Sequence, residues 1–288
     1  MTTTAPHRPA PPADDQPYVL GTGADEMFRL GLQHRLWSAS AHALWERAGI
    51  QPGWSVMDVG SGPGYAALDL AQIVGPAGRV IAVDESAAFL KQLHDYARAR
   101  RLENIDRVLG DVHDLDSVIE NGDGTLDAAY ARWVFCFCAE PEVVVKGLAR
   151  LLKPGGRIAV QDYFNYERSL TLAPRCEAFS KVIHAVGASW RSRGGSPDVM
   201  GSLPGVLSRH GFDITHMDVV QRVARPGSQM WHWPETFWDS FLPKLVESGF
   251  ITAVDRDAFL AAWKRAATTP GAFVQLPPVY ELIAVKKG

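Results

Sequence analysis

The fold of this chain is decided by the stretch Val56-Met57-Asp58-Val59-Gly60-Ser61-Gly62-Pro63-Gly64-Tyr65. Its first part is apolar except for one carboxylate, and it predicts a buried strand. The three glycines that follow permit a tight turn with positive φ, and residues 66–71 have the composition of a helix start. A glycine-rich turn between a strand and a helix offers free backbone N–H groups to a ligand. Many α/β proteins carry such a turn, so the other residues must identify the ligand.

The composition is that of a globular protein without a strongly charged partner. Of the 288 residues, 47% are hydrophobic and 21% are charged, and the formal net charge is −3. This balance gives no electrostatic field for nucleic acid or for an anionic membrane. There is no apolar run of the roughly 18 residues that a membrane span needs, and no signal-peptide core. Because three cysteines cannot form a disulfide framework, we expect a cytoplasmic protein.

Strand and helix patterns alternate after the glycine-rich stretch. Further strands are predicted at 79–84, 105–109, 126–130 and 157–160, and helices at 88–101 and 141–152. Strands that alternate with helices of this length form a mostly parallel sheet with helices on both faces. The sequence therefore predicts an α/β, doubly wound fold.

The N-terminal part divides into a tail and a helical segment. Residues 1–17 contain five prolines among small polar residues and predict a disordered tail. Apolar residues at helical spacing predict helices within 24–48, and Gly31 and Ser38-Ala39-Ser40 indicate two short helices. The polar residues Arg29, Gln33 and His34 lie beside this apolar stripe, where each one singly is best read as part of a solvated face.

The last 125 residues are less regular. Residues 164–210 look helical with breaks, and 214–220 and 280–286 predict strands. Between them, 222–278 form an aromatic insertion punctuated by prolines, with one helix from about 255 to 267 that Thr252 and Asp255 can cap. No segment here is long enough for a separate core. We therefore expect residues 18–288 to form a single domain, with 164–210 and 222–278 as lids.

Acidic residues end three neighbouring strands of the predicted sheet. Asp58 belongs to the first strand, Asp84 follows Gly64 by twenty residues, and Asp111 follows the third strand. The place of Asp84 is typical of the acid that binds ribose hydroxyls. A nicotinamide dinucleotide site would need glycine where Tyr65 stands, and Asp58 would repel a pyrophosphate. A cofactor that carries a sulfonium and an ammonium group tolerates that carboxylate.

These motifs resemble those of the class I S-adenosylmethionine-dependent methyltransferases over residues 54–163. The similar segments are the glycine-rich stretch, Asp84, Gly110-Asp111-Val112, Leu126-Asp127 and Leu151-Leu152-Lys153-Pro154-Gly155-Gly156. The nearest likeness is to the small-molecule branch that includes ubiquinone and menaquinone methyltransferases. The resemblance implies a Rossmann-like, mostly parallel seven-stranded sheet whose last strand, 280–286, runs antiparallel beside the fifth. It also implies helical N-terminal and lid insertions, and S-adenosylmethionine as the cofactor, with S-adenosylhomocysteine as the product.

The resemblance assigns the cofactor to residues of the strand ends and of the N-terminal helices. In this family an N-terminal helix folds over the cofactor, which makes Tyr18, Arg29 and Gln33 candidates for its carboxylate end. The full set of cofactor candidates is Tyr18, Arg29, Gln33, Asp58, Gly60, Ser61, Gly62, Gly64, Asp84, Glu85, Asp111, Val112 and Ala131.

Catalytic candidates are polar residues near the fourth and fifth strand ends and in the lids. They are His113, Arg132, Asp162, Tyr163, His184 and His232. A general base is needed only if the methyl acceptor must lose a proton. Each of these residues is about as easily a hydrogen-bonded structural group. No cluster of His, Cys or acidic residues has metal-ligand spacing, so no metal site is predicted.

Aromatic residues concentrate in the second half of the chain. Six of the nine tryptophans occur from Trp133 onwards, where they form either the core of the lids or the wall of a site for a flat substrate. We expect a monomer or homodimer that methylates a small, aromatic or polycyclic metabolite of secondary metabolism at carbon, oxygen or nitrogen. The alternative is a cyclase or other enzyme that binds the cofactor without transferring its methyl group.

Overall fold

The glycine-rich stretch joins β1 (Ser55–Val59) to α2 (Tyr65–Val74) in the computed structural model of the chain, which describes residues 23–120 and 122–288. The tail expected at 1–17 and the cofactor candidate Tyr18 lie outside the described residues.

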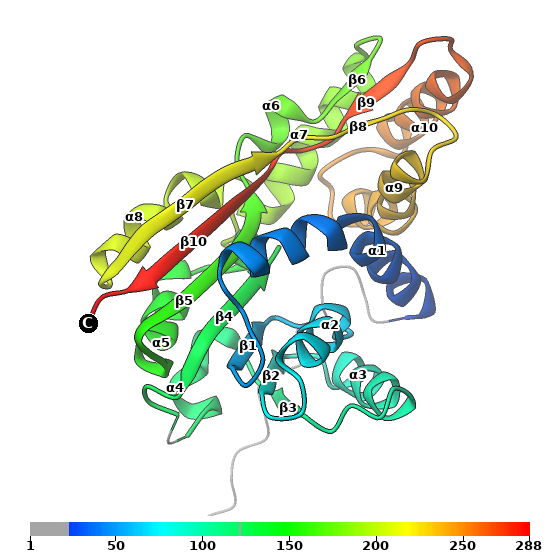
Figure 1. The fold of residues 1–288 in the computed structure, drawn as a ribbon. Coiled ribbons are helices and arrows are strands. Elements are labelled where there is room, and N and C mark those ends of the chain that lie inside the picture. The colour runs from blue at the N-terminus through cyan, green and yellow to red at the C-terminus, as the bar shows by residue number, and fades with distance from the viewer. Residues whose placement is uncertain (1–22, 121) are drawn as a thin grey trace, which may run out of the picture.

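A seven-stranded sheet forms the centre of the molecule, in the order β3-β2-β1-β4-β5-β10-β7 (Figure 1). The five strands β3, β2, β1, β4 and β5 run parallel to one another. Strand β10 is antiparallel to both of its neighbours, β5 and β7. The predicted doubly wound, mostly parallel sheet with an antiparallel last strand beside the fifth is therefore confirmed. The strands besides β1 are β2 (Arg79–Asp84), β3 (Ile105–Leu109), β4 (Leu126–Arg132), β5 (Leu152–Tyr163), β7 (Phe212–Val220) and β10 (Val279–Lys286).

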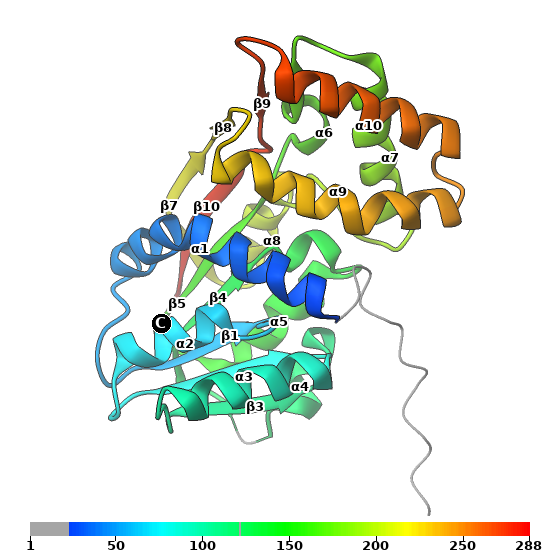
Figure 2. The ribbon, with the colours of Figure 1, turned by 90° about the vertical axis from the view of Figure 1, so that its right-hand side faces the viewer.

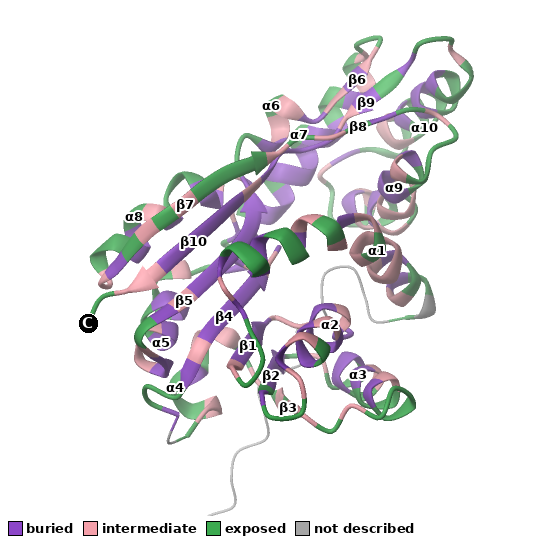
Figure 3. Ribbon diagram, viewed as in Figure 1, coloured by how far each residue is buried: buried purple, intermediate pink, exposed green. Residues whose placement is uncertain are grey.

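Helices cover both faces of the sheet because alternate strand residues point to opposite sides. On one face, Val56 of β1 and the strand residues that point the same way pack against α1 (Ala24–Arg47), α2 and α3 (Ala87–Ala99). On the other, Met57 and its equivalents pack against α4 (Leu115–Val118), α5 (Pro141–Leu151) and α8 (Leu203–Arg209). The central strands are buried along most of their length, whereas the edge strand β7 is largely exposed (Figure 3).

The N-terminal segment is one helix, α1 (Ala24–Arg47), so the prediction of two short helices was wrong. Gly31 does not end the helix but lets α2 approach, since a Cβ there would lie 2.9 Å from the Tyr65 hydroxyl oxygen. The Ser38 and Ser40 hydroxyls donate to the carbonyls of Arg35 and Trp37, so both serines are accommodated within the helix. Burial of Trp37 and Trp45 then stabilises the continuous helix.

A second layer of helices lies beyond the carboxyl ends of the parallel strands, with α9 and α10 above the sheet (Figure 2). We call this layer the lid; its members are α6 (Tyr166–Ser169), β6 (Thr171–Ala173), α7 (Glu177–Arg191), β8 (Val223–Ala224), α9 (Gln229–Glu247), α10 (Ala253–Thr268) and β9 (Phe273–Gln275). Its three strands pair in the order β6-β9-β8. The buried side chains of the lid belong to the same hydrophobic cluster as one face of the sheet.

Two lid features differ from the expectation or refine it. α8, at the end of the first expected lid segment, packs on α5 and β7 instead of over the strand ends. The proline-rich part of the second segment is the helix α9, with Pro234 and Pro243 inside it. Burial of its aromatic side chains outweighs the backbone hydrogen bonds that the prolines cannot make. The predicted cap of α10 is confirmed as a capping box of Thr252 and Asp255.

Three short 3₁₀ turns complete the described chain. They are η1 (Val112–Asp114), η2 (Phe135–Phe137) and η3 (Val199–Gly201).

Candidate active site

The loop after β1 depends on glycine for its shape. Gly60, Gly62 and Gly64 have φ values of 61°, 54° and 82°, a region that residues with a Cβ rarely occupy. At Gly64 a Cβ would also overlap the Leu93 side chain of α3. Gly64 is the N-cap of α2, so the loop directs the first N–H groups of that helix toward the strand ends.

Asp84, at the end of β2, stabilises this loop by hydrogen bonding. Its carboxylate accepts hydrogen bonds from the backbone N–H of Gly62 at 2.7 Å and of Ser86 at 2.9 Å. Burial raises the pKa of Asp84, and these two hydrogen bonds counteract the rise. The side chain thus lies where the β1–α2 loop, β2 and α3 meet, and it also borders the cavity described below.

Asp58 is a buried carboxylate with one oxygen that lacks a hydrogen-bond partner among the described residues. Burial raises its pKa to about 7, against the attraction of the Arg132 guanidinium. Its Oδ2 atom is buried and has no hydrogen-bond partner among the described residues, and the residue borders the cavity. A buried carboxylate oxygen without a donor is costly, and a cationic ligand group would compensate it. An ammonium group of the kind that S-adenosylmethionine carries fits this position.

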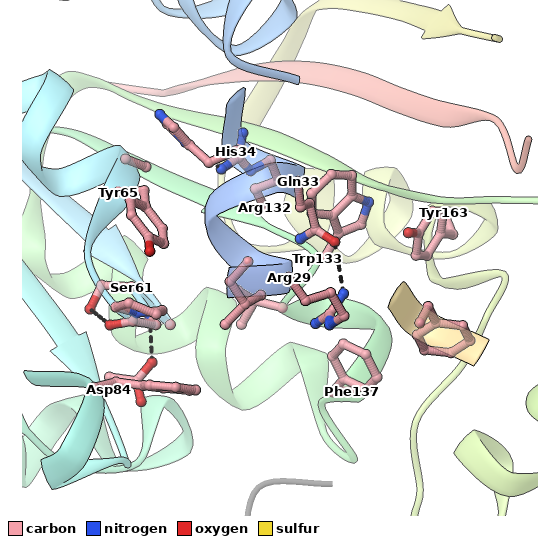
Figure 4. Close-up of a pocket in the computed structure, with 18 of the residues that line it drawn as sticks. Arg29, Gln33, His34, Ser61, Tyr65, Asp84, Arg132, Trp133, Phe137 and Tyr163 are labelled. Atoms are coloured by element: carbon pink, nitrogen blue, oxygen red, sulfur yellow. Dashed lines mark hydrogen bonds between the residues drawn. The ribbon is translucent and has the colours of Figure 1, made fainter. Parts of the chain in front are cut away.

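A cavity of about 790 Å³ opens between the strand ends and the lid. Figure 4 shows Ser61, Tyr65 and Asp84 at one end of it, and Trp133, Phe137 and Tyr163 at the other. The first end carries the three acids and the glycine loop. The second is lined by apolar and aromatic side chains from β5, η2, α6 and α9, among them Phe137, Tyr163, Tyr166, Leu170, Trp233, Phe237 and Trp238.

Stacked aromatic rings build the wall of this second end. Trp133 packs nearly parallel to both Tyr163 and Trp233, with ring centroids 6.0 Å apart and interplanar angles of 26° and 28°. Trp133 has a φ of 53°, an uncommon value for a residue with a large side chain. Such strain persists where the surroundings fix it, and here the Trp133 backbone N–H bonds the Gln161 carbonyl at 2.9 Å. The wall offers a flat, apolar surface of fixed geometry.

Helix α1 connects the first end of the cavity to the lid. Arg29 is buried and donates to both Glu26 carboxylate oxygens and to the Gln33 side-chain oxygen. The same Gln33 oxygen accepts from the Trp233 indole N–H of α9 at 3.0 Å. The lid wall is therefore tied through Gln33 to the helix that borders the cavity.

Most of the residues singled out in the sequence lie around this cavity. Those that line it are Arg29, Gln33, Asp58, Gly60, Ser61, Gly62, Asp84, Glu85, Asp111, Val112, Arg132 and Tyr163. Gly64 and Ala131 are not among the lining residues.

Four of the catalytic candidates do not line the cavity. Asp162 is fully buried and accepts from the backbone N–H groups of Cys136 and Tyr163, and burial raises its pKa to about 6. The three histidines are paired with acids: His113 with Asp111, His184 with Glu167 and His232 with Glu235.

Several cavity residues had no distinctive signal in the sequence. His34, Trp133 and Trp233 line the cavity, but a polar helix residue or a lid tryptophan looks the same in any helix or core. Their proximity arises only from packing. Across residues 23–120 and 122–288, no group of three or more His, Cys, Asp or Glu side chains could hold a metal ion.

Comparison with known proteins agrees with this geometry. Residues 57–160 match the family model described as "Methyltransferase domain". The 2-phytyl-1,4-naphtoquinone methyltransferase of Synechococcus elongatus is 36% identical over 151 residues, which cover 51% of this chain and 60% of that protein. The chain spans between 28% and 66% of the length of such curated relatives.

Solved structures share the fold at low identity. The cyclase SpnF superposes with a TM-score of 0.54 at 19% identity, covering 85% of this chain and 79% of that one. Geranyl diphosphate C-methyltransferase from Streptomyces coelicolor A3(2), in complex with S-adenosyl-L-homocysteine, gives a TM-score of 0.54 at 18% identity, covering 88% and 77%.

The sheet order and the cavity beyond its strand ends define a Rossmann-like methyltransferase fold. Over residues 57–160, where the domain matches, the chain is similar to S-adenosylmethionine-dependent methyltransferases that act on small molecules such as quinones. None of the helices in the described part of the chain is long and apolar enough to cross a membrane.

Proposed function

We propose that this protein transfers the methyl group of S-adenosylmethionine to a small, flat, aromatic or polycyclic metabolite. The observation that carries this proposal is the single cavity that joins Asp58 and Asp84 to a wall of stacked aromatic rings. Its 790 Å³ lies within the roughly 300–1,000 Å³ typical of small-molecule sites.

The cofactor residues are assigned to the first end of the cavity. Asp84 would accept the ribose hydroxyls, Asp58 would pair with the ammonium group, and Asp111 and Val112 would border the adenine. Ser61, Gly62 and the other loop residues would bring the backbone close to the cofactor. Arg29 and Gln33 would cover it from α1.

When bound, the cofactor would offer a methyl carbon on a sulfonium sulfur: the acceptor atom would bond to that carbon as the carbon–sulfur bond breaks and the thioether S-adenosylhomocysteine leaves. The chain contributes alignment and exclusion of water. Trp133, Tyr163 and Trp233 would hold the acceptor flat against the wall, and the lid helices would close the site. The aromatic faces would also favour a positively charged intermediate by cation–π contact.

Two polar side chains that line the cavity are poor proton acceptors. Burial raises the pKa of Tyr163 well above its usual value, so the phenol stays protonated. Both ring nitrogens of His34 are engaged, one with Asp69 and one with Arg132. These environments favour an acceptor that is already nucleophilic, such as an electron-rich ring carbon, an amine or an ionised hydroxyl.

Transfer of labelled methyl groups to a panel of phenols, indoles and quinones tests the proposal. Methylated product should appear together with an equal amount of S-adenosylhomocysteine. Failure of the protein to bind S-adenosylhomocysteine in calorimetry would contradict it.

A second candidate function is cyclisation with the methyl donor retained intact. A rigid aromatic wall would serve to fold a polycyclic precursor equally well, and the cyclase SpnF has the same fold. In that case product forms without S-adenosylhomocysteine, which distinguishes the two functions.

The remaining proposals concern the cellular setting. All three cysteines are free thiols, which is in keeping with the cytoplasm. We propose an enzyme of secondary metabolism, a monomer or homodimer whose partner is a small molecule and not nucleic acid or a membrane.

A further inference from the structure

Three elements of the fold bring Asp69, His34 and Arg132 into one hydrogen-bonded chain. The His34 Nε2 atom on α1 lies 3.0 Å from an Asp69 carboxylate oxygen on α2. Its other ring nitrogen, Nδ1, lies 2.9 Å from a guanidinium nitrogen of Arg132 at the end of β4. A second histidine of α1, His42, contacts the same Asp69 oxygen at 2.9 Å but not Arg132.

The chemistry of these groups fixes the proton on His34. A guanidinium can only donate, so Nδ1 must accept, and the ring proton is on Nε2, from which it bonds to Asp69. Burial, opposed by the hydrogen bond to Asp69, lowers the pKa of His34, which keeps the ring neutral. Asp69 therefore orients His34, and His34 orients Arg132.

The guanidinium of Arg132 is fixed by its hydrogen bond to His34, but one of its nitrogen atoms has no hydrogen-bond acceptor among the described residues. Its Nη1 atom is buried and has no hydrogen-bond partner among the residues that the structure describes. The guanidinium also lies 5.2 Å from the centre of the Trp133 ring, which restrains its plane. Figure 4 shows Arg132 between the loop end of the cavity and its aromatic end.

The same cavity contains the complementary unsatisfied group, the buried Asp58 Oδ2 atom. One unpaired cationic donor and one unpaired anionic acceptor fit a ligand that carries an ammonium and a carboxylate on one carbon. The amino-acid end of the cofactor has that form. Arg29, which the sequence suggested for the carboxylate, already binds both oxygens of Glu26.

We propose that Asp69 and His34 are positioning residues that hold Arg132 so that its Nη1 binds the carboxylate of the cofactor opposite Asp58. This inference rests on the proposed function. A charge-assisted hydrogen bond of this kind changes affinity by about tenfold or more.

The test measures carboxylate recognition as a ratio. Calorimetry gives the affinities of S-adenosylhomocysteine and of its decarboxylated form, which keeps the amine. The wild-type protein should prefer the carboxylate ligand by at least ~10-fold, and Arg132→Gln should reduce this preference to within ~3-fold.

The positioning residues have their own variants. His34→Leu should also reduce the preference, whereas His34→Asn should restore much of it, because its side-chain oxygen can accept from Arg132 where Nδ1 does. Asp69→Ala should give a partial loss. His42→Ala is the matched control, since it removes the other partner of Asp69 and should leave the preference unchanged. Melting temperatures show whether each variant is folded.

The possible outcomes distinguish a failure of the proposed function from a failure of the role proposed for Arg132. If the wild-type protein binds neither ligand, the proposed function is wrong. If it binds both equally, or if Arg132→Gln keeps the preference while Arg29→Gln loses it, the methyltransferase proposal stands and the role of Arg132 is refuted. Equal behaviour of His34→Leu and His42→Ala would refute the positioning role.

Discussion

Replacing Asp58 by asparagine should make the ligand-free protein more stable at pH 8 while weakening its cofactor binding. Asparagine keeps an oxygen to accept the backbone hydrogen bond from Ala67 that Asp58 receives, but it removes the buried charge. The buried Oδ2 oxygen has no hydrogen-bond partner among the described residues, and the residue lines the cavity. The charge therefore serves the ligand and not the fold.

The size of this gain in stability follows from the raised pKa of Asp58. Burial raises the pKa of Asp58 from 3.8 to about 7, which corresponds to about 4 kcal/mol lost from the folded state once the carboxyl ionises. An asparagine N–H left without a partner costs about 1–3 kcal/mol, so the net gain at pH 8 is about 2 kcal/mol. The unfolding entropy of a 288-residue chain is about 0.6 kcal/mol/K, so we expect the melting temperature to rise by roughly 3 °C.

The pH dependence has a definite sign. Because the folded protein holds this proton more tightly than the unfolded chain, the contribution of Asp58 to stability is highest below pH 3.8, falls between pH 3.8 and about 7, and is constant above that. The advantage of Asp58→Asn should therefore shrink or vanish near pH 5 and be constant above about pH 7.5.

Thermal unfolding of both proteins from pH 5 to 8.5 measures this difference, and calorimetry with S-adenosylhomocysteine should show at least ~10-fold weaker binding by the variant. Asp95→Asn, at an exposed ion pair with Lys91, is the matched control and should change little. An unchanged or lower melting temperature of Asp58→Asn at every pH would refute the reasoning.

Three further changes have clear expectations. Asp84→Ala should weaken S-adenosylmethionine binding by more than ~1 kcal/mol in calorimetry, because ribose hydroxyls and the Gly62 N–H both lose an acceptor; unchanged affinity would contradict that assignment. Gly64→Ala should lower the melting temperature well beyond Gly53→Ala, since both glycines have strongly positive φ but only the Cβ at position 64 overlaps a neighbour, Leu93; equal effects would mean that the overlap is relieved. Deleting residues 1–17 should leave melting temperature and activity intact, and a large loss of either would show that the tail takes part.

The sheet and the acidic end of the cavity could be predicted largely from sequence because their signals are local. Each of these strands is a short apolar run with an acidic residue at or just after its carboxyl end, as Asp84 and Asp111 show. Parallel strands bring such ends to one edge, so residues distant in sequence become neighbours without further information. The continuous α1 and the helical α9 were missed because tertiary burial overrode local helix breakers, Gly31 in one case and Pro234 and Pro243 in the other.

The sequence by itself determined the fold and the placement of the glycine loop and the acidic residues at one edge of the sheet, since hydrophobic periodicity and glycine conformation act within a few residues. Only the tertiary structure decided the aromatic wall and the contacts of Arg132. The wall joins Trp133 of the core to Trp233 of the lid, and Arg132 meets His34 across 98 positions of the chain. No local pattern encodes such pairs, because packing of separate helices and strands against one another sets which side chains meet.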